Sequence, residues 1–269
     1  MRRRFYAPPE RFAPDGATVV LAREESQHLR NVLRLRAGDE AFVFDGAGRE
    51  YACVVGDAAG AGGRRGETAT LEVRGEVEPQ RPESPLDLTL AVALLKGEKF
   101  DLVVQKATEL GAWRIVPVET KRAEVRLPRD GRDPAATTER VVRWRRLALE
   151  AAKQSGRARV PEVCAPVAFA ALVGGEAGAQ GEAGVDEERR LFFTERGGRG
   201  LAETMREWRT RPAKLTALVG AEGGWEDAEI ARASGGGWHA VTFGGRVLRA
   251  ETAAIVVTGL LQHLYGDLV

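Results

Sequence analysis

The sequence predicts an α/β domain with a mainly parallel sheet, preceded by a small β-barrel domain. Three observations support this fold class. Residues 1 to about 75 contain short apolar or alternating runs separated by turns, which is typical of a small barrel. Residues 76–85 contain three prolines and few apolar side chains, as an interdomain linker does. From residue 86 to residue 269, apolar runs of strand length alternate with segments of helical periodicity, which favours a parallel sheet covered by helices.

The expected strands of the first domain are short and are separated by turn residues. An Asp-Gly pair at residues 45–46 follows one of them and favours a hairpin. One short helix is expected at residues 24–33, because Leu29, Val32 and Leu33 then share one face. The strands are expected at residues 18–21, 40–44, 50–55 and 68–74.

The second domain begins with a continuous apolar run at residues 86–95, as expected for a strand that is covered on both faces. Apolar residues then recur at helical spacing from Phe100 to Leu110, and Gly111 follows where a helix commonly ends. A loop is expected at residues 174–190, which are rich in glycine and glutamate. The remaining expected elements are strand 113–118, helix 134–153, strand 191–194, helix 201–208, strand 215–219, helix 225–233, a strand that ends at Phe243, and a last helix to about Tyr265.

The composition argues against several classes of protein. With 43% hydrophobic and 29% charged residues, the chain is typical of a globular protein rather than a disordered one. The net charge of +1 does not by itself indicate a nucleic-acid binder, although residues 1–36 carry eight arginines against four acidic residues. Two cysteines and three histidines show no metal-site spacing, so no metal is expected. The most apolar run, residues 253–261, is too short to span a bilayer, and the basic start lacks a signal-peptide core, so we expect no membrane contact and a cytoplasmic location.

Three of the expected strand ends lead into small or polar residues, at Thr194-Glu195, 220–224 and 243–246. In an open parallel sheet, ligands bind beyond the C-terminal ends of the strands, where backbone amides and helix N-termini are available. The phosphate loop, the dinucleotide-binding glycine motif and the serine nucleophile elbow are all missing from the sequence. The sequence therefore predicts a pocket lined largely by backbone, of a kind that the common motifs do not describe.

The last of these strand ends carries the most chemistry. Gly244 and Gly245 allow a ligand to approach the backbone closely, because no Cβ atom is present. Arg246 and Arg249 supply forked cationic donors that suit phosphate or carboxylate groups. Glu251 falls in the first turn of the last helix, where the helix dipole favours a negative charge. The alternative is an ordinary strand-turn-helix corner with solvated arginines.

Four segments together carry a resemblance to a known family: 96–99 with 105–111, 150–157, 220–224 and 243–253. They resemble the RsmE-type methyltransferases of the SPOUT class, which methylate N3 of a uridine in bacterial small-subunit (16S) ribosomal RNA. The resemblance covers the whole chain, since this family also carries an N-terminal PUA-like barrel. Two departures are visible, because Ala221 stands where the family usually has proline and Phe243 where it usually has leucine.

The resemblance implies a PUA-like barrel at residues 1–75, a linker at 76–85, and a trefoil-knotted SPOUT methyltransferase domain at 86–269. It implies that the enzyme works as a homodimer on small-subunit ribosomal RNA or on the assembled subunit. It also implies that S-adenosyl-L-methionine is the cofactor. The residues expected to bind this cofactor are Thr194, Gly220, Glu222, Gly223, Gly224, Phe243, Gly244, Gly245, Arg246, Val247 and Leu248.

Uracil N3 carries a proton, so its methylation requires that this proton be lost. A cation near a uracil oxygen would stabilise the resulting anion, and a carboxylate could accept the proton. Our hypothesis gives the cationic role to Arg249 or Arg246 and makes Glu251 the base or an orienting group; alternatively, Glu251 only caps the helix and pairs with an arginine. The residues expected to contact RNA, or else to be ordinary solvated charges, are Arg2, Arg3, Arg4, Lys96, Lys99 and Arg157.

Two other functions fit parts of the sequence. The chain could be a non-catalytic RNA-binding protein whose α/β domain is an inert scaffold. It could also be an enzyme that acts on a phosphorylated metabolite, with Arg246 and Arg249 as an anion clamp. Binding of S-adenosyl-L-methionine would distinguish the methyltransferase from both.

Overall fold

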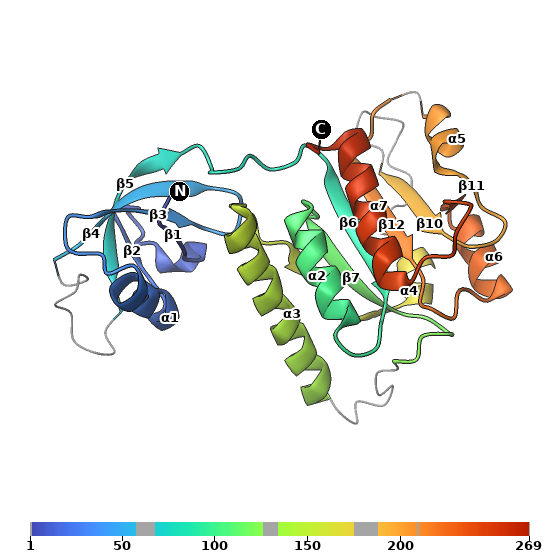
Figure 1. Cartoon of the computed structure of the whole chain (residues 1–269), viewed down its shortest axis with the longest axis horizontal. Helices are drawn as coiled ribbons and strands as arrows, with labels where there is room; N and C mark the ends of the chain where they lie inside the picture. The colour runs from blue at the N-terminus through green and yellow to red at the C-terminus, as the bar shows by residue number, and fades with distance from the viewer. Residues whose placement is uncertain (1, 58–67, 126–133, 175–187, 209, 269) are drawn as a thin grey trace. The chain divides into compact units, whose positions relative to one another are not determined.

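The computed structural model describes residues 2–57, 68–125, 134–174, 188–208 and 210–268. The chain divides into two compact units, and the first of them is discontinuous in sequence. It consists of Met1–Glu83 together with Ala152–Val160, and the second consists of Ser84–Ala151 and Pro161–Val269. Both units are drawn in Figure 1.

The N-terminal unit contains a five-stranded sheet in the order β1-β3-β4-β5-β2. Strands β1 and β3 are parallel, and the other pairs are antiparallel. Side chains such as Phe5, Val19, Val43 and Leu71 are fully buried in its core. The sequence did not predict β1, because three residues are too few to show an alternating pattern. The strands are β1 (Arg4–Tyr6), β2 (Thr18–Val20), β3 (Glu40–Phe44), β4 (Glu50–Val55) and β5 (Thr70–Val77).

The single helix expected at residues 24–33 is divided into two kinds of turn. Helix α1 (Arg23–Gln27) is followed by the π-helical segment η2 (His28–Val32). A separate short 3₁₀ helix, η1, lies earlier in the chain at Pro9–Arg11. The wider π turn changes the angular spacing of the side chains. Leu29 is therefore buried, but Val32 is 66% exposed, so the expected common apolar face was wrong.

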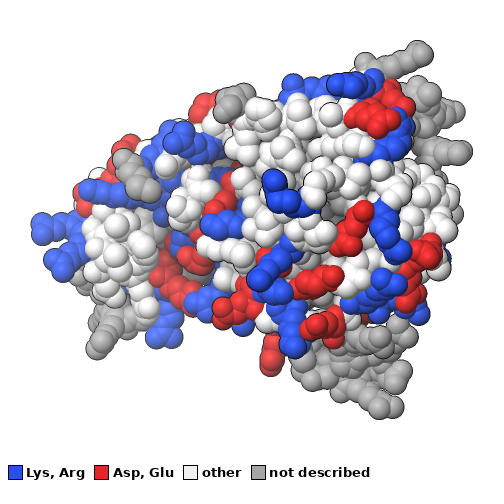
Figure 2. Space-filling model, turned by 45° about the vertical axis from the view of Figure 1, so that its right-hand side comes forward, with Lys and Arg blue, Asp and Glu red and all other residues white. Residues whose placement is uncertain are grey.

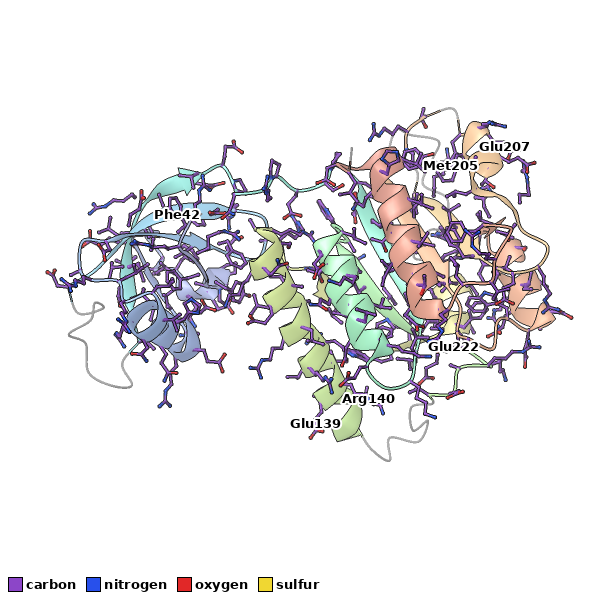
Figure 3. The ribbon with its side chains drawn as sticks, viewed as in Figure 1. Phe42, Glu139, Arg140, Met205, Glu207 and Glu222 are labelled. Atoms are coloured by element: carbon purple, nitrogen blue, oxygen red, sulfur yellow. The ribbon has the colours of Figure 1, made fainter. Side chains whose placement is uncertain are left out.

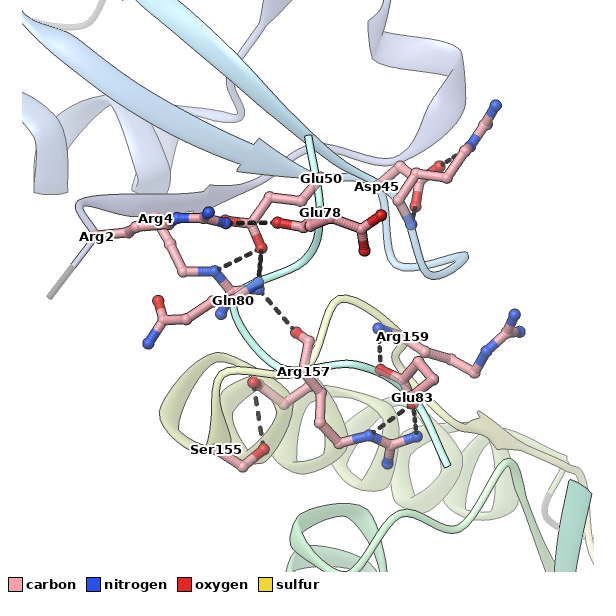
Figure 4. A network of polar contacts seen from close by, with 12 residues as sticks. Arg2, Arg4, Asp45, Glu50, Glu78, Gln80, Glu83, Ser155, Arg157 and Arg159 are labelled. Atoms are coloured by element: carbon pink, nitrogen blue, oxygen red, sulfur yellow. Dashed lines mark hydrogen bonds and ion pairs between the residues drawn. The ribbon is translucent and has the colours of Figure 1, made fainter. Parts of the chain in front are cut away.

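Residues 152–160 complete the polar contacts of the N-terminal unit. The guanidinium of Arg157 forms an ion pair of 2.7 Å with Glu83, and both side chains are largely buried. Figure 4 shows this pair within a wider polar network of the same unit. Lys153 forms a second ion pair, also of 2.7 Å, with the buried Glu25. These contacts explain why a segment so far along the chain belongs with the barrel.

The C-terminal unit is built on a parallel sheet in the order β11-β13-β10-β12-β6-β7-β8, with β9 also paired to β7. Every strand pair in the described part of this sheet is parallel, which confirms the predicted sheet type. The strands are β6 (Asp87–Ala93), β7 (Arg114–Glu119), β8 (Glu162–Val163), β9 (Val167–Ala168), β10 (Arg189–Phe193), β11 (Arg199–Gly200), β12 (Lys214–Val219) and β13 (His239–Thr242).

Helices cover both faces of this sheet, as the continuous apolar strands predicted (Figure 1). Helix α7 packs on α2 and against β6 and β12, whereas α4 packs on α6. The core beneath α4 and α6 is aromatic, with Phe169, Phe192 and Trp225 in mutual contact. The helices are α2 (Lys99–Glu109), α3 (Pro134–Ser155), α4 (Phe169–Gly174), α5 (Leu201–Arg206), α6 (Asp227–Gly235) and α7 (Ala250–Tyr265).

The order of the strands determines where the loops meet. Strand β10 lies between β12 and β13, so the chain passes from β12 across β10 before it forms β13. It then returns as α7 to lie over β12 and β6. Because β10, β12 and β13 are adjacent parallel strands, the loops that follow them lie at one edge of the sheet. Most of the loop expected at residues 174–190 lies outside the described residues, and Arg189 and Arg190 instead begin β10.

Candidate active site

A pocket of about 400 Å³ lies at the C-terminal ends of β10, β12 and β13. Its volume falls within the range of about 300–1,000 Å³ that is common for small-molecule sites. Three loops that are far apart in sequence form its walls, and they are the three loops that the sequence singled out. Most of the residues that we expected to bind the cofactor line this pocket: Thr194, Gly220, Glu222, Gly224, Phe243, Gly244, Gly245, Arg246, Val247 and Leu248. Arg249, which we expected to act on the uracil, lines it as well.

The first wall of the pocket contains Gly220, and any larger residue at this position would displace the neighbouring Trp225 ring. A Cβ atom at Gly220 would lie 2.8 Å from Cε2 of Trp225. The indole is fixed there because its Nε1 donates a 2.8 Å hydrogen bond to the carbonyl of Phe193. Gly223 is not among the pocket residues, and a Cβ atom there would instead meet Arg122 at 3.0 Å. Its small size therefore lets the loop approach the segment that follows β7.

The second wall exposes backbone toward open space. Gly244 and Gly245 adopt left-handed conformations, with φ of +67° and +71°. A Cβ atom at either position would meet nothing within 4 Å. The peptide groups here are thus accessible to a ligand, and the left-handed backbone favours glycine at both positions. These features fit a cofactor that is bound through backbone and shape, as S-adenosyl-L-methionine would be.

An ion pair lies at one side of the pocket. Lys99 Nζ donates to Glu222 Oε1 at 2.5 Å, and Figure 3 shows Glu222 near the end of α7 where that helix begins. The hydrogen bond to Glu222 raises the pKa of Lys99, and the negative charges of Glu222 and Glu251 add to this effect. Burial tends to raise the pKa of Glu222, but the Lys99 hydrogen bond, a backbone hydrogen bond and the Lys99 charge lower it overall. Both groups therefore stay charged over a wide range of pH.

Glu251 lies in the first turn of α7 and is only 8% exposed. It is not among the pocket residues, although the adjacent Arg249 and Ala250 are. Its Oε2 atom is buried and has no hydrogen-bond partner in the part of the chain that the structure describes. The expected alternative, an ion pair between Glu251 and an arginine, is not seen among those residues. A ligand that offers an N–H group could satisfy this oxygen.

The arginines at the N-terminus are largely committed to the barrel. Glu50 is fully buried and pairs with Arg2 at 3.0 Å and with Arg4 at 3.1 Å (Figure 4). The guanidiniums of Arg2 and Arg4 also stack over the rings of Phe42 and Phe44, each at 4.7 Å. Arg3, in contrast, is exposed. A phosphate contact by Arg4 would have to compete with a buried carboxylate.

The other residues expected to contact RNA differ in accessibility. The side chain of Lys96 is 76% exposed and lies 3.4 Å from Glu124. The side chain of Arg157 is 6% exposed and faces Glu83, so an RNA phosphate could reach it only by breaking that pair. Figure 2 shows basic and acidic side chains mixed over the face in view rather than one broad basic field. Direct RNA contact stays a prediction for these residues.

Glu195 and Trp225 are among the pocket residues that the sequence did not single out as binding residues. Glu195 lines the pocket, and its Oε2 would lie 3.6 Å from a Cβ atom at Gly224. Trp225 forms part of the wall directly after the glycine loop. Their positions next to predicted pocket residues were a usable signal, but sequence alone did not show which way the side chains point.

Comparison with known proteins identifies the class to which this fold and pocket belong. Residues 82–262 match the family model of an RNA methyltransferase domain, and residues 21–60 match that of an RNA methyltransferase PUA domain. The chain therefore belongs to the RNA methyltransferase family. This confirms the predicted fold class, a SPOUT-type α/β domain that follows a PUA-like barrel.

Similar proteins share nearly the whole chain. The ribosomal RNA small subunit methyltransferase E of Synechocystis sp. is 33% identical over 92% of this chain and 74% of its own length. The protein of the same name from Bacillus subtilis is 26% identical over 99% of this chain and 100% of its own. The crystal structure of the Neisseria gonorrhoeae enzyme bound to S-adenosyl methionine has a TM-score of 0.79, with 29% identity and full coverage of both chains.

Within the described residues, no helix combines the length and the apolar character that a membrane span requires. No group of three or more His, Cys, Asp or Glu residues in that part of the chain could hold a metal ion.

Proposed function

We propose that this protein uses S-adenosyl-L-methionine to methylate N3 of a specific uridine in bacterial small-subunit ribosomal RNA. The pocket at the ends of β10, β12 and β13 carries this proposal, because its glycine walls leave backbone open to a ligand. Relatives named for methylation of small-subunit ribosomal RNA support the substrate. A similar structure bound to S-adenosyl methionine supports the cofactor.

The residues of the pocket have distinct roles in this proposal. The bound cofactor supplies an electrophilic methyl group. The peptide groups of Gly244 and Gly245 and the side chain of Thr194 line the space that it fills. Holding the two reactants in line and excluding water accounts for much of the rate in such a transfer. No covalent nucleophile is required of the protein.

The charged residues act on the uracil. Arg249 and Arg246 line the pocket and are exposed, so either guanidinium can approach a uracil oxygen and stabilise the anion that forms. Glu251 Oε2, which has no partner among the described residues, is the candidate acceptor of the N3 proton. Because Glu251 is buried, it can reach N3 only if the uracil enters the pocket deeply or if the first turn of α7 shifts.

The proposal extends to the setting of the reaction. A ribosomal substrate implies a cytoplasmic enzyme that acts on naked RNA or on the assembled subunit. A homodimer is also proposed, as the resemblance to the RsmE-type enzymes implies. Light scattering of the purified protein would test the dimer.

The test of the function uses purified protein, S-adenosyl-L-methionine with a labelled methyl group, and small ribosomal subunits that lack the modification. We expect the label in 3-methyluridine after nuclease digestion and mass spectrometry. Calorimetric titration with the cofactor is run in parallel. Label in another nucleoside would contradict the uridine N3 assignment, and failure to bind the cofactor would contradict the methyltransferase itself.

A further inference from the structure

A second cavity, of about 440 Å³, lies in the C-terminal unit at the end of β7. Helices α4 and α6 form its other walls. Its lining shares no residue with that of the first pocket. Nothing proposed above uses this space.

One residue that lines this cavity carries a buried hydroxyl that the fold leaves unsatisfied. Thr120 is 8% exposed, and its Oγ1 atom has no hydrogen-bond partner within the described residues. A buried polar group left unpaired destabilises the folded state. Valine would fill the same volume without that cost. The presence of threonine thus points to a partner that is bound only at times.

The carboxylates around the cavity are not equivalent. Both oxygens of Glu229 accept backbone hydrogen bonds, from Lys121 N at 3.1 Å and from Glu226 N at 3.0 Å. The side chain of Glu226 in turn caps the start of α6. Glu119 differs, because its half-buried carboxylate has no hydrogen-bond or ion-pair partner in the described part of the chain. Glu119 and Thr120 therefore offer a strong acceptor next to a hydroxyl that can donate or accept.

The remaining walls suit a flat ring on a charged chain. Phe169 supplies an apolar surface and is itself fixed by Trp225, whose ring centre is 5.4 Å away. The exposed cations Lys121 and Arg232 lie at the rim. A ring would pack against the aromatic side chain, its polar edge would face Glu119, and phosphates would reach the rim.

We propose that this cavity binds a nucleobase with an exocyclic amino group, supplied by the RNA near the uridine that is methylated. Guanine fits best, because its adjacent N1–H and N2–H groups can both donate to one carboxylate. Adenine and cytosine offer one amino group, and uracil offers none. The cavity then helps to select the RNA sequence around the target. This inference rests on the proposed function for its source of the base.

The cavity is close enough to the first pocket to serve the same RNA. Arg122, which follows the cavity residue Lys121, donates from Nη1 to the carbonyl of Gly223 at 3.2 Å. Trp225 lines the first pocket and contacts Phe169, which lines the second. The loop that follows β12 thus lies between the two sites and contacts both.

The experiment compares the full-length protein with Thr120→Val and Glu119→Gln in steady-state methylation of RNA. Thr120→Val removes only the hydroxyl, and Thr18→Val on β2 is a matched control in the N-terminal unit. We expect the KM for RNA to rise about five- to tenfold for Thr120→Val and more than tenfold for Glu119→Gln. The kcat and the affinity for S-adenosyl-L-methionine should not change. Guanosine monophosphate should compete with RNA for the unaltered protein and much less for either variant.

An unchanged KM for RNA in both variants would overturn the inference, as would the same rise in the Thr18→Val control. Competition by uridine monophosphate as strong as that by guanosine monophosphate would overturn the assignment of an amino-bearing base. These outcomes are distinct from failure of the proposed function, in which no variant and no unaltered protein would bind the cofactor or methylate RNA.

Discussion

Replacing Glu251 by glutamine should make the protein more stable and much less active. The carboxylate is 8% exposed, and its Oε2 has no partner among the described residues. A neutral amide of the same shape is easier to bury than a carboxylate. If Glu251 accepts the uracil proton, the amide cannot do so.

The size of both effects follows from the site. An unsatisfied buried polar atom costs about 1–3 kcal/mol and an unsatisfied charged one costs more, so the amide regains only the difference; it also forgoes the roughly 0.3–1 kcal/mol that a carboxylate in the first turn of a helix gains from the helix dipole. The free energy of unfolding of the C-terminal unit should therefore rise by about 1 kcal/mol in Glu251→Gln. Loss of a general base lowers a rate by about 10²- to 10⁴-fold, and we expect kcat to fall by that factor.

Urea denaturation followed by tryptophan fluorescence measures the stability, and single-turnover methylation measures the rate. Glu139→Gln is the matched control, since Glu139 is exposed on α3 (Figure 3) and its replacement should change stability by less than about 0.5 kcal/mol. Near-normal turnover with intact cofactor binding would remove Glu251 from the mechanism. A marked loss of stability would show that the carboxylate is satisfied by a group such as bound water.

Three further predictions concern packing, a buried ion pair and a thiol. In Gly220→Ala, the new Cβ atom would lie 2.8 Å from Trp225. We therefore expect the free energy of unfolding to fall by about 1–3 kcal/mol and cofactor binding, measured by calorimetry, to weaken at least tenfold. The control is Gly259→Ala in α7, where a Cβ atom meets nothing within 4 Å, and it should not weaken binding. Glu50→Gln leaves the charge of the largely buried Arg4 uncompensated, so the free energy of unfolding measured with urea should fall by about 3–5 kcal/mol. In the exposed pair of Glu72 and Arg74, Glu72→Gln should change it by less than about 0.5 kcal/mol. Similar losses for both variants would refute the special role of burial. Burial raises the pKa of Cys53 from 9.0 to about 12. The thiol therefore ionises at a lower pH in the unfolded chain than in the folded one, and stability should decline as the pH rises above about 9. Rapid labelling of Cys53 in the native protein by a thiol reagent near that pH would contradict this.

The sequence predicted the C-terminal sheet closely, because its strands are buried on both faces and read as continuous apolar runs. The expected run at residues 86–95 became β6, and the run at 215–219 became β12. Strands β8, β9 and β11 have two residues each, and their pairing depends on tertiary contacts that leave no periodic pattern. The π turn at His28–Val32 was missed for a related reason, since hydrophobic spacing assumes a regular helix.

The candidate site was predictable in its loops and less so in its side chains. Glycines after strand ends indicated where backbone would be open, and the pocket lies there. Charge in the sequence did not reveal which arginines are committed to internal partners. Arg157 was expected to contact RNA, yet its partner Glu83 lies 74 residues earlier in the chain. Only the fold brings such pairs together, so roles assigned to surface charges need a structure.

The discontinuity of the N-terminal unit has a consequence for its modularity. A gene fragment that ends at Glu83 would encode every strand of the barrel sheet but not residues 152–160. Glu83 would then lose Arg157, and Glu25 would lose Lys153. The barrel is therefore a domain with an insertion rather than an independent N-terminal module, and fusing or deleting it as one continuous segment would not transfer a complete folding unit.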